Sequence, residues 1–410
     1  MRRVAITGVG MISPVGNDRE SCWNALSAGV SGIGRITRFD ASGFDVQLAG
    51  EVKGSLPLPE SVSKTARHDP KVGFACAACE EAMRHAGVAG LGPRSLLHVA
   101  TSLETFDLGK LIHNGKPDFR AVVARSLEAA ATPLQFPLDA AANLIIERYG
   151  RPGQSLTNCS ACAAGAQAIG HAFHAIRSGR FDMALCGGFD SMINPLGVGG
   201  FQLLGALTTR NELGPLACRP FDSQRSGTVL GEGAAMVVLE PLETAQTAGK
   251  TILAEICGYG SSLDAHSVSA PDPDGNGAER AMRAALADAG IPPAEIAHIN
   301  AHGTGTVLND AIEAKAVRRV FADTWQRIPV SATKSMTGHL IAAAGALEVG
   351  ACLLAIVRGA LPPNPALKRA GPDCELNHVT EPGRVFAGGH VLSNSFGFGG
   401  QNATLVLRNT

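Results

Sequence analysis

One thiol and two imidazoles in this chain stand where strand-like runs give way to glycine-containing turns. Cys162 lies in the string NCSACAAG, His302 in NAHGTGT and His339 in KSMTGH. Because strands of one sheet can end at the same edge, these three side chains can meet at one place. A sulfur nucleophile beside two neutral hydrogen-bond donors suits acyl transfer combined with carbanion chemistry.

Cys162 is flanked by small residues, with Ala161 before it and Ala163, Ala164 and Gly165 after it. Small neighbours allow a thiol to sit on a tight strand-to-helix turn at a helix N-terminus. There the helix dipole and free N–H groups lower the pKa of the thiol and favour the thiolate. The alternative interpretation is a small buried cysteine of the core, which is the commoner fate of a cysteine among alanines.

Two Cys-x-x-Cys pairs carry weaker signals. Cys159 and Cys162 form one pair, but a redox role is disfavoured because the surrounding sequence differs from that of thioredoxin-like proteins. Cys76 and Cys79 lie in an alanine-rich helical run with no second pair nearby to complete a zinc site. Core packing is the better interpretation of this second pair, and no metal site is expected.

Polar residues accompany both histidines. Thr304 and Thr306 follow His302 in a loop whose glycines permit close backbone approach, and their hydroxyls can hydrogen-bond a polar arm such as a pantetheine amide. Lys334 stands in apolar sequence, so a buried partner is expected. Glu348, equally isolated in an apolar helix, is the natural candidate. Without such neighbours, a strand-end histidine is more often structural and a lysine more often solvated.

A glycine-rich loop, residues 394–402, follows the last predicted strand. It lacks the Lys and Ser or Thr of a phosphate-binding loop, so nucleotide binding is disfavoured, and its backbone N–H groups can instead complete an oxyanion hole. Near the N-terminus, Gly8 and Gly10 hint at a dinucleotide-binding turn after the first strand. That signal is weak, because the third glycine is missing and Pro14 interrupts the helix start.

Strand-like runs alternate with alanine-rich helical stretches, a pattern typical of α/β layers with largely buried sheets. The predicted strands are 4–7, 96–101, 154–158, 183–186, 235–240, 297–300, 328–331 and 391–393. The predicted helices include 74–85, 163–178, 278–289 and 311–321.

Two pairs of helical segments look alike and occur in the same order, which favours a duplicated half. Residues 163–170 resemble residues 343–350, and residues 81–87 resemble residues 284–290. Each helix of the first pair opens beside a candidate catalytic residue.

We therefore expect two similar halves, residues 1–245 and 246–410. They would meet where Pro241 and a turn at 246–250 separate two strand-like segments.

Length and composition limit the classes of protein. At 410 residues the chain exceeds what one core usually supports, and 45% hydrophobic against 17% charged residues indicates a well-buried globular protein. A net charge of −1 with scattered Lys and Arg does not indicate a nucleic-acid-binding surface. Unevenly spaced cysteines without a secretory signal predict reduced thiols and a cytoplasmic protein. The apolar stretch 340–357 contains Glu348 and many small residues, which favours a buried helix over a membrane span.

Together these motifs resemble the elongating 3-oxoacyl-acyl-carrier-protein synthases, the Cys-His-His ketosynthases of the thiolase superfamily. The matching segments are those around Cys162 and His302, 334–339, 394–400, 4–16, 197–201, 219–222, and Arg225 with Gly227. The likeness covers most of the chain and is strongest from about residue 150 onward. A degradative thiolase is less similar because it carries a second cysteine near its C-terminus, and the initiating synthases use Cys-His-Asn.

This resemblance implies an α/β, thiolase-like five-layer αβαβα fold made of two similar halves. It implies a homodimer, or else a heterodimer with a chain-length-factor-like subunit, that works with an acyl carrier protein. No cofactor is expected on the chain, since phosphopantetheine arrives on the carrier protein. No nucleic-acid or membrane partner is expected either.

The implied reaction is decarboxylative Claisen condensation of an acyl group with malonyl-acyl-carrier-protein, giving a 3-oxoacyl-carrier protein in fatty-acid or specialised polyketide or polyene synthesis. In it Cys162 accepts the acyl group, His302 and His339 hydrogen-bond the malonyl thioester carbonyl, and Lys334 orients this pair. The resemblance also assigns supporting roles: an oxyanion hole from the backbone N–H groups of Cys162 and Phe398, substrate binding by Thr304, Thr306 and the gating Phe398, and structural support from Glu348 and Asn394. The alternative is a non-condensing acyltransferase or a structural partner subunit of the same fold.

Some segments depart from the family pattern. Residues 101–105 replace the usual glycine-rich turn after a strand, and the stretch 101–145, which in relatives lines the acyl pocket and the dimer contact, is barely similar. Gly205 stands where relatives often carry an arginine. The remaining candidate contacts for an acidic carrier protein are Lys64, Arg67, Lys71 and Arg210. These departures favour a specialised pathway over a housekeeping one.

Overall fold

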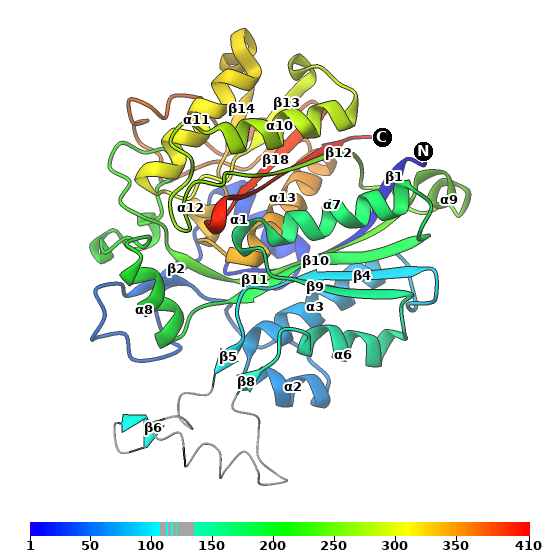
Figure 1. The fold of residues 1–410 in the computed structure, drawn as a ribbon, viewed down its shortest axis with the longest axis horizontal. Helices are drawn as coiled ribbons and strands as arrows, with labels where there is room; N and C mark the ends of the chain where they lie inside the picture. Colours follow the sequence, from blue (N-terminus) through cyan, green and yellow to red (C-terminus); the bar gives the residue numbers. More distant parts are fainter. Residues whose placement is uncertain (107–111, 114–115, 118–119, 121–134) are drawn as a thin grey trace.

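The computed structural model describes residues 1–106, 112–113, 116–117, 120 and 135–410. Its elements stack as helix, sheet, helix, sheet, helix (Figure 1). This arrangement confirms the predicted five-layer αβαβα fold.

The second and fourth layers are formed by the two halves of one 13-stranded sheet, each built around five main strands. The first runs β9-β4-β10-β11-β1 and the second β12-β19-β18-β13-β14, and the two are joined where β1 pairs antiparallel with β12. The strands of the first half are β1 (Val4–Ile12), β4 (Ser95–Ala100), β9 (Gln154–Asn158), β10 (Met183–Ser191) and β11 (Leu230–Pro241). Those of the second are β12 (Ala254–Leu263), β13 (Ile296–Asn300), β14 (Pro329–Ser331), β18 (His390–Phe396) and β19 (Gln401–Arg408).

Both halves of the sheet share one topology. When the strands are numbered within their own half, each half has the order 3-2-4-5-1. The prediction of two similar halves is therefore confirmed. The predicted boundary between residues 245 and 246 falls inside α9 (Leu242–Thr247), a short helix where a turn at 246–250 was expected.

Helices cover each half of the sheet on both faces. The middle layer holds α7 (Ala164–Arg177) and α13 (Ala344–Arg358), which pack against each other and are followed in Figure 1 between the two halves of the sheet. The outer layers are formed by α3 (Pro70–His85) with α2 (Glu60–Ala66) and α6 (Ala140–Tyr149), and by α10 (Asn276–Ala289) with α11 (Val307–Phe321).

The remaining elements are short. The helices are α1 (Arg19–Ala28), α8 (Pro195–Leu203) and α12 (Lys334–Thr337). The strands are β2 (Ile33–Arg35), β3 (Leu48–Gly50), β5 (Thr105–Phe106), β6 (Ile112–His113), β7 (Lys116–Pro117), β8 (Gln135–Phe136), β15 (Ala360–Leu361), β16 (Asn377–His378) and β17 (Arg384–Val385).

The two middle helices open with the same strained turn. Ala161 and Ile341, 180 positions apart, have φ of 48° and 46°, in the left-handed region that non-glycine residues rarely adopt. Each residue starts a 3₁₀ turn that leads into α7 or α13. Cys162 thus occupies the position that Ala342 occupies in the other half.

The turn that was expected at Gly8 and Gly10 after the first strand is not formed, because both residues lie inside β1. Helix α3 packs directly on this strand. A Cβ at Gly8 would stand 2.3 Å from the carbonyl oxygen of Ala82, and one at Gly10 would stand 2.0 Å from that of Ala78. The glycines therefore serve close helix–strand packing rather than a dinucleotide.

The C-terminal segment also differs from its prediction. The expected loop 394–402 is a short connection, since β18 extends to Phe396 and β19 begins at Gln401. Strand β19 was not predicted, and β12 was expected only as a strand-like segment without bounds after the turn at 246–250. The stretch Ile341–Arg358 is long and apolar enough to cross a membrane, but 83% of it is buried, which confirms the expected core helix.

Candidate active site

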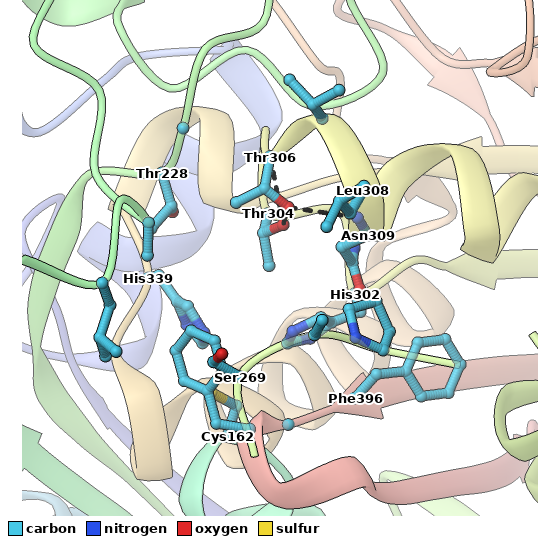
Figure 2. A pocket seen from close by; sticks show the side chains of 18 of the residues that line it. Cys162, Thr228, Ser269, His302, Thr304, Thr306, Leu308, Asn309, His339 and Phe396 are labelled. Carbon is cyan, nitrogen blue, oxygen red and sulfur yellow. Dashed lines mark hydrogen bonds between the residues drawn. The ribbon is translucent and has the colours of Figure 1, made fainter. Parts of the chain in front are cut away.

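One cavity of about 240 Å³ brings together Cys162, His302 and His339, which come from segments far apart in the chain (Figure 2). Cys162 lies in the turn between β9 and α7, and His302 follows β13. His339 follows α12, just before the turn that opens α13. The predicted meeting of the three side chains is confirmed by their shared cavity.

The loop after β18 approaches the turn of Cys162 closely. A Cβ at Gly397 would stand 3.1 Å from the backbone nitrogen of Cys162, so only glycine fits there without displacement. The backbone N–H groups of Phe398 and Cys162 lie near enough to the thiol to oppose the rise of its pKa. The oxyanion hole expected from these two groups stays a prediction.

The thiol of Cys162 is not the low-pKa thiolate that its turn predicted. Burial raises its pKa to about 11, although hydrogen bonds from backbone N–H groups and the charge of Lys334 act in the opposite direction. The helix N-terminus is outweighed because the sulfur lies in an apolar cluster with Met192, Ile193 and Val198.

Both histidines are held as neutral imidazoles. Burial, with the nearby Lys334 charge, keeps the pKa of His302 and of His339 well below the usual value of 6.5. The N–H of Ile341 donates to Nδ1 of His339 at 3.2 Å, and Lys334 Nζ lies 3.3 Å from Nδ1 of His302. Each Nδ1 is thus an acceptor, so each ring carries its proton on Nε2.

Lys334 is buried, and its ammonium group has several hydrogen-bond partners. Its Nζ donates to Glu348 Oε1 at 2.5 Å and to the backbone carbonyl of His302 at 2.6 Å. The predicted Lys334–Glu348 pair is confirmed. Because the ammonium contacts both the main chain and the ring of His302, it fixes that ring and its tautomer together.

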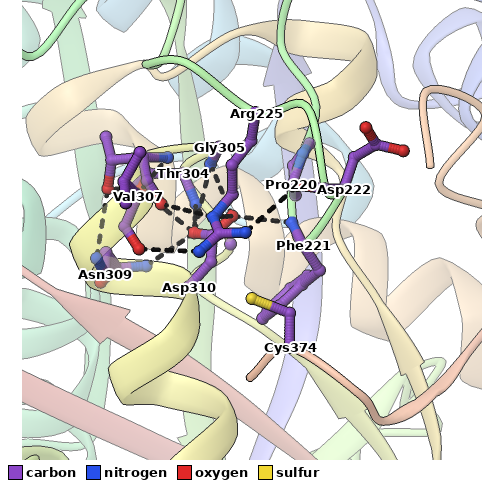
Figure 3. Close-up of polar contacts among 12 residues, drawn as sticks. Pro220, Phe221, Asp222, Arg225, Thr304, Gly305, Val307, Asn309, Asp310 and Cys374 are labelled. Carbon is purple, nitrogen blue, oxygen red and sulfur yellow. Dashed lines mark hydrogen bonds and ion pairs between the residues drawn. The ribbon is translucent and has the colours of Figure 1, made fainter. Parts of the chain in front are cut away.

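Thr304 and Thr306 line the cavity, and their hydroxyls lie 2.9 Å apart. Thr306 also caps α11, accepting from the N–H of Asn309. Asp310 organises this loop from behind (Figure 3), since its buried carboxylate accepts the N–H groups of Thr304, Gly305 and, at 2.7 Å, Phe221.

Sequence reasoning missed Asp310 and a second carboxylate, Glu313. Glu313 accepts the N–H groups of His302 and Gly303, both at 2.8 Å, and the side-chain amide of Asn394 at 3.2 Å. Burial raises the pKa of Glu313 to about 7. The helix that carries both acids also contains Lys315, Arg318 and Arg319, so in the sequence they look like part of a solvated charged face.

Asp190, at the end of β10, was also missed. Its carboxylate accepts the N–H of Ala342 at 3.0 Å and the hydroxyl of Ser102 at 2.8 Å, and burial raises its pKa to about 6. The first half thereby holds the turn that follows His339 in the second half.

The predicted contacts for a carrier protein do not form one exposed set. Lys71 is buried on α3 beside Asp69, at 3.8 Å, so its role as a surface contact is wrong. Lys64 and Arg67 are exposed, and Arg210 pairs with Glu212 at 2.9 Å.

The segment 101–145 is described only in part, and residues 107–111, 114–115, 118–119 and 121–134 lie outside the described residues. Of the described residues, Ser102 to Thr105 and Leu138 line a separate recess of about 480 Å³, which also contacts Met192 and Cys159.

Comparison with known proteins is consistent across the chain. Residues 1–245 match the Beta-ketoacyl synthase, N-terminal domain, and residues 253–368 match the Beta-ketoacyl synthase, C-terminal domain. The 3-oxoacyl-[acyl-carrier-protein] synthase 2 of Coxiella burnetii is 40% identical, over 99% of this chain and 98% of the relative. That of Synechocystis is 37% identical with the same coverage.

Solved structures are similar over 100% of this chain. A beta-ketoacyl synthase from Burkholderia phymatum is 32% identical with a TM-score of 0.88, covering all of that chain. The ishigamide ketosynthase/chain length factor is 35% identical with a TM-score of 0.87, over 99% of that chain. A type II polyketide ketosynthase, bound to its acyl-carrier protein and a hexaketide, is 31% identical with a TM-score of 0.87, over its full chain. This chain therefore belongs to the beta-ketoacyl synthase family and is a ketosynthase, an acyltransferase.

Proposed function

We propose that the chain condenses an acyl group held on Cys162 with the malonyl thioester of an acyl carrier protein, releasing CO2 and a 3-oxoacyl thioester. The observation that carries this proposal is the shared cavity, in which one thiol meets two imidazoles whose Nδ1 atoms are already occupied. Two Nε2–H donors beside a nucleophile suit a carbonyl oxygen that gains negative charge.

Acyl loading is the first half-reaction. The sulfur of Cys162 forms a bond to the acyl carbon while the bond from that carbon to the pantetheine sulfur breaks. The proton leaves the thiol of Cys162 and ends on the departing pantetheine sulfur. The N–H groups of Cys162 and Phe398, both near the thiol, would hold the oxyanion of the tetrahedral intermediate.

Condensation is the second half-reaction. The malonyl thioester loses CO2, and the bonding electrons pass into an enolate whose oxygen accepts hydrogen bonds from His302 and His339. The enolate carbon then attacks the acyl carbon on Cys162, and the carbon–sulfur bond breaks to free the thiolate, which takes a proton from water. No strong base is required at any step, which agrees with two neutral rings.

The surroundings of Cys162 also agree with an acyl substrate. Met192, Ile193, Val198 and the partly buried Phe398 form an apolar cluster around the sulfur. Thr304 and Thr306 stand farther along the same cavity, where they would hydrogen-bond the amides of a pantetheine arm.

The relatives support a proposal about partners and pathway. One structural relative is a ketosynthase/chain length factor, and another is bound to its acyl-carrier protein. We infer that this chain likewise pairs with a second copy or with a chain-length-factor-like subunit, and receives phosphopantetheine on a carrier protein. The type II polyketide system of the second relative supports a specialised polyketide pathway. A polyene product and a cytoplasmic location stay predictions from the sequence.

Incubation of the protein with an acyl-carrier thioester and malonyl-carrier protein tests the proposal. Mass spectrometry should show an acyl adduct on Cys162, followed by a 3-oxoacyl carrier and CO2. The Cys162→Ala variant should lose condensation but retain malonyl decarboxylation, because the two histidines remain. Condensation at an unchanged rate in that variant would contradict the proposed role of Cys162. An acyl adduct without any 3-oxoacyl product, at every chain length tried, would favour the non-condensing acyltransferase.

A further inference from the structure

A cationic recess of about 470 Å³ lies outside the catalytic cavity, between the loop that follows β10 and α8 and the loop that follows β15. It is lined by Arg219, Asp222, Ser223, Gln224, Lys368 and Arg369. Residues 219–228 continue from this recess to the catalytic cavity, which Ser226, Gly227 and Thr228 line. The proposed reaction uses none of the six side chains.

The buried carboxylate of Asp222 in this recess already accepts several hydrogen bonds. Asp222 is buried, and its carboxylate accepts the N–H groups of Gln224, Lys368 and Arg369 at 2.8, 2.8 and 3.1 Å. Arg219 approaches the same carboxylate at 3.1 Å. Asp222 therefore fixes both loops, and its single negative charge leaves two of the three cationic side chains uncompensated.

Arg219 has a hydrogen-bond donor that no described residue accepts. The residue is only 9% exposed, yet its buried Nε donates to no partner that the structure describes. Leaving a buried guanidinium donor unpaired is costly, so a ligand acceptor is expected at this point.

The rim carries the other two cations. Lys368 and Arg369 are exposed, and within the described part of the chain neither forms an ion pair. A local excess of two positive charges contrasts with a net charge of −1 for the whole chain. Such a cluster attracts anions.

We propose that this recess binds a phosphate monoester. The lining offers one buried guanidinium, an exposed lysine and a second, exposed guanidinium, together with the polar side chains of Ser223 and Gln224. A tetrahedral dianion with three free oxygens satisfies such a set better than a planar carboxylate does.

One segment of the chain links the recess to the wall of the catalytic cavity, because Gln224 lines the former and Ser226 the latter. Arg225 stands between them in the sequence and donates to the backbone carbonyls of Thr306 at 3.1 Å and Val307 at 2.8 Å (Figure 3). Both of those residues line the catalytic cavity. The phosphate can arrive on a nucleotide thioester or as the free ion, since both present the same chemistry.

Direct binding tests this site without any turnover, so it stands or falls apart from the proposed condensation. Titration calorimetry of the full chain with inorganic phosphate at low salt should show saturable binding. The variant Lys368→Gln/Arg369→Gln changes only exposed side chains and should weaken binding by about tenfold or more. Arg219→Gln should do the same, with circular dichroism confirming that it folds. The matched control is Arg84→Gln, an exposed arginine on α3, which should bind as wild type does.

Competition experiments distinguish a nucleotide thioester from the free phosphate ion as the ligand of the recess. Displacement of phosphate by coenzyme A but not by dephospho-coenzyme A would place the 3′-phosphate of a nucleotide thioester in the recess. If neither competes, the site takes the free ion. Equal displacement by both would overturn the monoester assignment. The whole proposal is overturned if phosphate shows no saturable binding, or binds all four proteins alike.

Discussion

At the scale of single residues, burial governs the chemistry of the site more than helix position does. The thiol of Cys162 sits at the start of α7, yet its pKa is raised because apolar side chains surround it. The same burial lowers the pKa of His302 and His339 and thereby keeps both rings neutral. Burial therefore disfavours the thiolate form of Cys162. It also keeps the two imidazoles neutral, as their proposed role as hydrogen-bond donors requires.

The reactivity of Cys162 should therefore depend steeply on pH. Below a pKa of about 11 the thiolate fraction, and with it the alkylation rate, rises about tenfold for each pH unit. Iodoacetamide labelling of Cys162, followed by peptide mass spectrometry from pH 7 to 9, should climb throughout this range. A plateau reached below pH 8 would show that the helix N-terminus prevails after all.

Lys334 and Glu348 form a pair whose members are expensive to separate. Glu348→Ala would leave the ammonium buried without its counterion, at a cost of about 3–5 kcal/mol in the free energy of unfolding. Urea denaturation measures this loss. The double variant Lys334→Met/Glu348→Leu should recover much of the stability but not the decarboxylation rate, since the ring of His302 loses its orienting contact. Recovery of both would contradict the positioning role of Lys334.

At the scale of elements, the two similar halves pack against each other closely at a glycine of α7. Helices α7 and α13 both start at the catalytic cavity, and they approach closely enough that a Cβ at Gly165 would stand 2.7 Å from the carbonyl oxygen of Ala342. Asp190 reinforces the same junction through the N–H of Ala342. The turns that carry Cys162 and His339 are thus packed directly against each other.

Gly165→Ala should destabilise the protein despite the better helix propensity of alanine. The added methyl must displace backbone, which costs about 1–3 kcal/mol. Gly200→Ala on α8 is the matched control, because nothing lies within 4 Å of the added Cβ. The control should be neutral or gain up to about 1 kcal/mol. Thermal denaturation of the two variants compares them, and equal melting temperatures would disprove the close contact.

At the scale of the whole molecule, the described sheet ends at β16 on one side and at β9 on the other. Strand β9 is the last in the sheet order, and no described strand pairs with its far side. Leu156 on this strand is 38% exposed. An unpaired edge with an apolar side chain is a template for pairing with another chain, which agrees with the dimer that we propose.

Leu156→Lys should shift the protein from dimer toward monomer. The lysine introduces a charge at an edge that would otherwise pair with an identical strand, or with that of a partner subunit. Light scattering after size exclusion measures the mass, and Arg84→Lys, on the outer face of α3, serves as a control that should stay dimeric. A wild-type protein that is monomeric at every concentration would refute the dimer.

Much of the architecture could be read from local patterns. The strings around Cys162, His302 and His339 combine reactive side chains with small or glycine neighbours, and this composition marks exposed turns at strand ends wherever it occurs. Alanine-rich helices recurring 180 positions apart revealed the duplication. Lys334 and Glu348 were paired correctly because each is an isolated charge in apolar sequence.

Properties that depend on distant neighbours could not be read this way. Gly8 and Gly10 look like a turn until α3 packs on β1. The carboxylate of Asp190 has a structural role only because it accepts the N–H of Ala342, which is 152 positions away. The acidity of Cys162 likewise depends on which apolar side chains exclude water from it. Local residue types encode backbone geometry and chemistry, whereas burial and long-range hydrogen bonding arise only once the layers are stacked.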